Sequence, residues 1–181
     1  MTHGEHASSD SWGYRLRQLG LALWGTPGRD DLAAAERILS PAEYSLFRQL
    51  QASEQAHALN ILRALQAQGE AERILLAAAL LHDVGKAAQR LSLIGRVAVV
   101  LGQQVLPEKV KTWGIGQPSG WKRPFVIAAQ HPAWGAEMAA RAGSPAEVVA
   151  LIAAHQEPAP AGMNEAMRKR LLALQAVDNQ H

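Results

Sequence analysis

His82-Asp83-Val84-Gly85-Lys86 directly follows an unbroken apolar run over residues 74–81. A run that is apolar on every side is typical of a helix packed at the centre of a domain. The sequence therefore predicts that a histidine and a carboxylate lie at the end of a buried helix. Burying a charge without a partner is costly, so this arrangement indicates either paired groups or a metal ion.

Histidines elsewhere in the chain strengthen the metal interpretation. The chain has seven, and four lie along its middle rather than at its ends: His57, His82, His131 and His155. A late acid, Asp178, follows them. Imidazole suits zinc, copper, iron and nickel, whereas carboxylate suits harder ions such as magnesium and manganese. The mixed set predicts divalent ions, one or two in number, with iron or manganese favoured.

Two ions a few ångströms apart need a ligand in common. A carboxylate has two oxygens with which to bridge them, and Asp83 is the predicted bridge. The remaining coordination positions are open to water and substrate, and a metal-activated hydroxide can attack phosphorus near neutral pH. Glu54 lies three residues before His57 on the same predicted helix face and is a candidate partner for that ligand.

Composition predicts an all-α fold. The 181 residues are 48% hydrophobic, with few aromatics and much alanine and leucine, which favour helices. This length is typical of one domain. We expect residues 1–39 to form an N-terminal tail with accessory helices, compact with a metal-binding domain over residues 40–181. The absence of cysteine excludes disulfides and thiolate ligands.

The sequence also gives expectations for compartment and local structure. Residues 1–6 lack the layout of a signal peptide, and no apolar run approaches the roughly 18 residues of a membrane span. We therefore expect a cytoplasmic protein without a membrane partner, of undetermined oligomeric state. The signals for local structure are the apolar periodicity, the prolines and three capping residues, Ser40, Ser144 and Asn164. They predict a polar tail over residues 1–10 and an irregular segment over residues 102–120. They predict helices at about residues 11–23, 31–39, 40–68, 70–81, 92–101, 123–130, 131–141, 145–155 and 164–178.

Positive charge is concentrated after the opening motif. Residues 84–123 carry seven lysines and arginines against one acid, although the whole chain is only +2. A positive field beside the predicted site favours an anionic ligand, so we expect a small phosphorylated substrate. The predicted substrate-binding residues are Lys86, Arg90, Lys122 and Arg123. No aromatic and basic platform or reading helix stands out, so nucleic acid is not expected as a partner.

In order, His57…His82-Asp83…Asp178 resembles the H…HD…D pattern of the HD-domain superfamily, and residues 82–86 are similar to its HDIG variant. The resemblance covers roughly residues 40–180 and extends to small single-domain bacterial members. It implies a single-domain HD-type helical bundle and, most often, a metal-dependent phosphohydrolase. It also implies that these four residues hold the first metal.

The resemblance further implies roles for three other positions. His131 and His155 would join Asp83 at a second metal, and Lys86 would contact substrate phosphate. The chain departs from many dinuclear relatives at Gln156, where they have a second histidine, and it lacks the GYP signature of cyclic-di-GMP phosphodiesterases.

Three functional hypotheses remain at this point. The leading one is hydrolysis of a phosphate ester, a nucleotide among the candidates, with Asp83 and Lys86 as catalytic residues. The alternative is a di-iron HD-type oxygenase acting on a small polar substrate, because one branch of the superfamily uses the same four histidines and two aspartates. The third is a non-catalytic module stabilised by metal.

Overall fold

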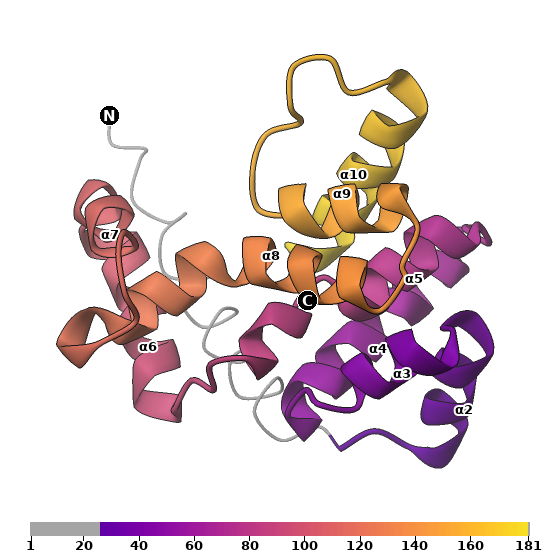
Figure 1. The fold of residues 1–181 in the computed structure, drawn as a ribbon, viewed down its shortest axis with the longest axis horizontal. Helices are drawn as coiled ribbons and strands as arrows, with labels where there is room; N and C mark the ends of the chain where they lie inside the picture. The colour runs from indigo at the N-terminus through magenta and orange to yellow at the C-terminus, as the bar shows by residue number, and fades with distance from the viewer. Residues whose placement is uncertain (1–25, 181) are drawn as a thin grey trace, which may run out of the picture.

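The computed structural model describes residues 26–180, where every regular element is a helix (Figure 1). This confirms the all-α prediction. The helix expected at residues 11–23, the polar tail, and the terminal His3, His6 and His181 lie outside the described residues. The elements are α2 (Arg29–Ile38), α3 (Pro41–Phe47), α4 (Ala52–Ala67), α5 (Arg73–Leu81), the 3-10 turn η1 (Val84–Ala87), α6 (Leu93–Val105), α7 (Pro107–Trp113), the 3-10 turn η2 (Gly120–Lys122), α8 (Arg123–Arg141), α9 (Ala146–Ala154) and α10 (Glu165–Asp178).

The main core is built around α5. Its residues from Leu75 to Leu81 are all buried, as their apolar run predicts. Helices α2, α3, α4, α9 and α10 all pack against it. The chain therefore leaves the centre of the bundle at the residue where His82 begins the motif.

One predicted helix is two helices in the structure. The sequence predicts continuous helix over residues 40–68, but residues 48–51 separate α3 from α4. A second helix start lies in the middle of the predicted span, because the Gln51 N–H donates to the Glu54 carboxylate at 3.0 Å. Glu54 stands three residues after the capping residue Gln51. An acid in this position accepts from a backbone N–H that would otherwise have no partner at the helix N-terminus.

Two predicted helices are one in the structure. The sequence predicts a new helix at His131-Pro132, but α8 runs without interruption through Pro132. The prediction was wrong because it placed proline in a first helical turn, where it is best tolerated. The histidine is therefore held inside a long helix rather than at a helix start.

The segment predicted to be irregular, residues 102–120, contains the end of α6 and all of α7. Pro107 occupies the first turn of α7, a position that suits proline. Helices α6 and α7 form an arm against the N-terminal half of α8, at the left of Figure 1. A small separate cluster of Val99, Val110 and Phe125 joins them. Among residues 26–180, no helix is both long and apolar enough to span a membrane.

Candidate metal centre

Five helices deliver the six predicted ligands to one place. Two histidines are the residues that end helices, His82 after α5 and His155 after α9. Asp178 is the last residue of α10, whereas His57 and His131 lie within α4 and α8. The bundle therefore brings together side chains that are up to 121 residues apart in the sequence.

The first group of ligand atoms joins α4, α5 and α10. The Nε2 atom of His57 lies 3.0 Å from Oδ1 of Asp178, and Nε2 of His82 lies 3.6 Å from the same oxygen. The two rings are in edge contact, with centroids 5.4 Å apart. Atoms of these three residues lie within 4.8 Å of one another, which makes the group a candidate metal site.

The second group surrounds Asp83. Its Oδ1 atom lies 3.1 Å from Nε2 of His131 and 3.9 Å from Nε2 of His155. Its Oδ2 atom lies 3.6 Å from Nε2 of His82. Together, His82, Asp83 and His155 form another candidate site that shares His82 with the first. The two oxygens of one carboxylate thus face different histidines.

Three of the histidine rings have their tautomer set by backbone carbonyls. In each ring, Nδ1 lies 2.8–3.1 Å from a backbone carbonyl of the preceding helical turn. The carbonyl belongs to Ala79 for His82, to both Ile127 and Ala128 for His131, and to Ile152 for His155. A carbonyl only accepts, so Nδ1 carries the hydrogen. In a neutral ring, Nε2 is then a lone pair.

All three of these Nε2 atoms are buried without a hydrogen-bond partner. Leaving a buried polar atom unsatisfied is costly, and such atoms are rare in folded proteins. At His131 the lone pair faces an oxygen of Asp83 only 3.1 Å away, which places two acceptors against each other. A cation between them would satisfy both, so the donor set present here fits a bound metal.

Pro132 has a local role at His131. Proline has no N–H, so the carbonyl four residues earlier, that of Ala128, loses its usual helical donor. In the structure that carbonyl accepts from Nδ1 of His131 at 3.0 Å instead. The His-Pro pair therefore orients the ring without ending α8.

Gly85 allows the motif to approach α8. A Cβ atom at this position would lie 2.0 Å from the carbonyl oxygen of His131 and 2.7 Å from the backbone nitrogen of Gly135. Both clashes are with backbone, which cannot move as a side-chain tip can. The motif glycine therefore sets the distance between Asp83 and His131.

Electrostatics keep the acids ionised and His155 neutral. Burial is the largest single influence on Asp83 and would raise its pKa, but the charge of Lys86 together with His82 and His131 outweighs burial and holds this pKa well below its usual value. Burial acts in the same direction on Asp178, yet the hydrogen bond from His57 and the nearby His82 lower its pKa to about 2. Burial and then His82 lower the pKa of His155 to about 3. Anionic oxygens and a neutral imidazole are the protonation states that metal binding requires.

The predicted substrate-binding residues are not all beside the centre. Lys86 does lie beside the centre: its ammonium is 2.5 Å from Oδ2 of Asp83, and its side chain is 25% exposed. Arg123 instead donates to the carbonyl of Arg90 and to the side chain of Gln89. Lys122 lies over the ring of Trp121, 5.6 Å from its centroid. Substrate binding by Arg90, Lys122 and Arg123 therefore stays a prediction.

Arg96 was missed by the sequence reasoning. Its guanidinium donates to the buried carboxylate of Glu54 at 2.7 Å. Glu54 lies one turn before His57, so this ion pair joins α6 to the helix that carries the ligand. A signal was present, because Arg96 is the single charged residue between positions 91 and 107.

A cavity of about 520 Å³ opens beside the centre. His155 and Asp178 contribute to its wall, together with amide side chains: Gln103, Gln156, Gln175 and Asn179. The sequence reasoning did not find Gln103, because nothing in its surroundings separates it from any other polar residue of an exposed helix. Gln156 is thus a cavity-lining residue.

The protein is thus an all-α bundle in which imidazoles and carboxylates from five helices, four of them buried and two half-buried, form a candidate metal centre. The family comparison supports this class, because the model of the HD domain matches residues 50–179. The chain belongs to the HD-domain family, which implies divalent metal binding and whose members are generally metal-dependent hydrolases. No curated protein and no solved structure matched the chain.

Proposed function

We propose that this HD-domain protein cleaves a phosphate ester with two divalent ions held at the histidine centre, iron or manganese being favoured by the donor set. The position of Asp83 carries the proposal, because its two oxygens face different histidines. The predicted substrate is small and anionic, with nucleotides among the candidates.

Each residue has a definite part in this proposal. One ion would be held by His57, His82, Asp178 and one oxygen of Asp83, and the second by the other oxygen with His131 and His155. Bound ions supply a coordinated water of lowered pKa and neutralise charge on the phosphoryl group.

The chain itself provides the surroundings of the reaction. Burial of His82, His131 and His155 keeps water from their side of the centre, which strengthens the electrostatic contacts there. Lys86 lies at the partly exposed edge of the centre. Its ammonium would leave Asp83 to contact a phosphoryl oxygen, where it stabilises the charge that develops during the reaction.

Elemental analysis with a phosphatase assay tests the proposal. We expect two ions per chain and hydrolysis of p-nitrophenyl phosphate or of members of a nucleotide panel. Asp83→Ala should abolish both metal binding and turnover, whereas Asp30→Ala, at an exposed acid of α2, should change neither.

Other results would decide against hydrolysis. Equal turnover by the Asp83→Ala protein would exclude a role for the centre. Iron together with dioxygen consumption would favour the di-iron oxygenase. A metal that raises the melting temperature, with no activity on any substrate, would favour the non-catalytic module.

A further inference from the structure

The exposed large apolar side chains of residues 26–180 gather in one part of the fold. Eight of the nine lie between residues 93 and 121. Five are on α6 and follow one another at helical spacing, which places them on one side of the helix. We call them the α6 stripe: Leu93, Ile94, Val97, Leu101 and Val105. Single exposed apolar residues are ordinary, but a contiguous stripe indicates a surface that something covers.

The stripe is separate from the sides of α6 that already have partners. Gly95 and Val99 are buried on the side that packs on α8. Arg96 reaches Glu54, and Gln103 lines the cavity beside Asp178. One helix therefore carries a packed side, a side that reaches Glu54 and the cavity beside the candidate metal centre, and an apolar side without a described partner.

The sequence before α2 has a matching pattern. Trp12, Leu16, Leu19 and Leu23 are spaced by four, three and four residues, which places them on one face if this segment is helical. These residues lie outside the described part of the chain. At about 1.5 Å per residue, a helix over them would be about 17 Å long, against about 18 Å for the α6 stripe.

We propose that residues 12–24 of the same chain pack along the α6 stripe. The connection is long enough. Asp31 of α2 is bonded to Arg63 of α4, nine residues or about 14 Å along that helix from Glu54, which holds α6. Gly28 caps α2 and Arg29 begins it, so the connection from Trp24 to Asp31 spans at most about 18 Å: about 13 Å for the four residues up to Gly28 when extended, and about 4.5 Å for the three in the first turn of the helix.

Tethering favours this occupant over others. A segment joined by a short linker has an effective concentration in the millimolar range, well above that of a second copy at micromolar protein. Packing on the α6 stripe would also hold α6 against the metal site. Residues 12–24 would then position Arg96 and Gln103 without touching the ligands.

Thiol labelling tests the proposal directly, because the chain has no cysteine of its own. A cysteine at Leu101→Cys in the full chain should react with a maleimide at least ten times more slowly than one at Glu137→Cys, an exposed position on α8. Adding Leu16→Asp and Leu19→Asp should restore fast labelling at position 101. Adding Arg15→Asp and Arg17→Asp, which changes charge but leaves the apolar pattern, should preserve protection.

Each alternative occupant gives a different result. Protection that is unchanged by dilution, in a protein that elutes as one chain, supports the proposal. Protection lost on dilution would assign the α6 stripe to a second copy. Protection only with phosphatidylglycerol vesicles would assign it to a lipid surface, and fast labelling under all conditions would leave it uncovered. Any of these three overturns the proposal, and none depends on metal or on turnover.

Discussion

Glu43 and Asp83 are buried to almost the same degree, 1% and 3% exposed, yet their surroundings are opposite. Glu43 accepts three hydrogen bonds at 2.8 Å, from the backbone of Ser40, the hydroxyl of Ser144 and the guanidinium of Arg73. Asp83 is bonded to Lys86, but it otherwise meets imidazole nitrogens whose hydrogens are on the far side of the ring.

The difference distinguishes a structural carboxylate from a candidate metal ligand. Burial alone does not, because both groups are removed from water. A buried polar atom is stable when its partners are present in the chain. Glu43 has all of its partners and joins the starts of α3 and α5 to the turn before α9. Asp83 has only Lys86 as a donor, and the three unsatisfied Nε2 atoms would gain partners only if an ion were bound.

The largest effect is expected from Gly85→Ala, which would separate Asp83 from its histidines. The new Cβ would meet the backbone of His131 at 2.0 Å, so η1 and α8 must move apart. We expect a loss of about 3 kcal/mol in the free energy of unfolding, at the upper end for overpacking, together with loss of bound metal. Urea unfolding and elemental analysis measure the two effects.

Gly28→Ala is the matched control for this glycine. A Cβ there would lie 3.1 Å from the tip of the Asp31 side chain, which can move aside. We expect a change below about 1 kcal/mol, as for other helix N-caps, and unchanged metal content. A Gly85→Ala protein that kept both its stability and its metal would show that the close approach is not needed.

A crossed pair of substitutions tests the comparison itself. Glu43→Gln should lower the free energy of unfolding by about 2 kcal/mol, because it weakens charge-assisted hydrogen bonds, but it should leave metal content intact. Asp83→Asn should remove most of the bound metal. When both proteins are free of metal, this variant should be about as stable as the wild type. If both variants lost metal equally, the two carboxylates would not have separate roles.

Much of the fold was predictable because it depends on local signals. The apolar run before His82 predicts a buried helix, and the caps Ser40 and Asn164 begin α3 and α10 as expected. Ser144 is different: its hydroxyl donates to Glu43, 101 residues away, rather than capping α9. The predictions were wrong at residues 48–51, in α7 and at Pro132. At each place the local residues can either begin or end a helix, and tertiary contacts decide between the two.

The site was predictable in composition but not in geometry. The order of histidines and aspartates resembles the HD-domain pattern, and this resemblance implies which residues meet. Three features depended on the folded structure: Gly85 against α8, the freed carbonyl of Ala128, and the ion pair of Arg96 with Glu54. Each is a contact that forms only in the folded chain, and no pattern in the sequence indicates it.

The pH dependence of stability should distinguish Glu43 further. Burial would raise its pKa, but the hydrogen bonds from Ser40 and Ser144 and the charge of Arg73 outweigh it and lower the pKa below 4.5. The unfolded chain therefore takes up this proton first as the pH falls. The stabilisation is complete above about pH 4.5 and is lost as the pH falls through the folded pKa.

Comparison with Glu43→Gln isolates this group from the other acids. The difference in free energy of unfolding between wild type and variant should be constant from pH 7 to about pH 5 and should shrink below that. Urea unfolding at each pH measures it. A difference that stayed constant to pH 3 would mean that the pKa of Glu43 is the same in the folded and unfolded protein.

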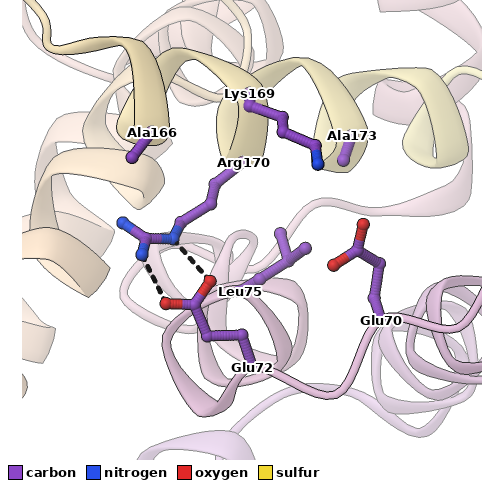
Figure 2. A pocket seen from close by; sticks show the side chains of 7 residues that line it. All are labelled: Glu70, Glu72, Leu75, Ala166, Lys169, Arg170 and Ala173. Carbon is purple, nitrogen blue, oxygen red and sulfur yellow. Dashed lines mark hydrogen bonds and ion pairs between the residues drawn. The ribbon is translucent and has the colours of Figure 1, made fainter.

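The smallest effect is expected where charges are paired but exposed. In a shallow pocket of about 130 Å³ between the start of α5 and α10, Arg170 donates two hydrogen bonds to Glu72, one of them at 2.8 Å from Nε (Figure 2). The pocket contains acids and bases, as the metal centre does, but its main charges satisfy each other in contact with solvent. Exposed pairs of this kind contribute little to stability and are screened by salt.

Glu72→Gln should therefore shift the melting temperature by less than about 2 °C and leave metal content unchanged. The shift in melting temperature should be smaller still in 0.5 M salt than at low ionic strength. A loss of metal from this variant would show that pairing in the structure is a poor guide to which charges bind ligands.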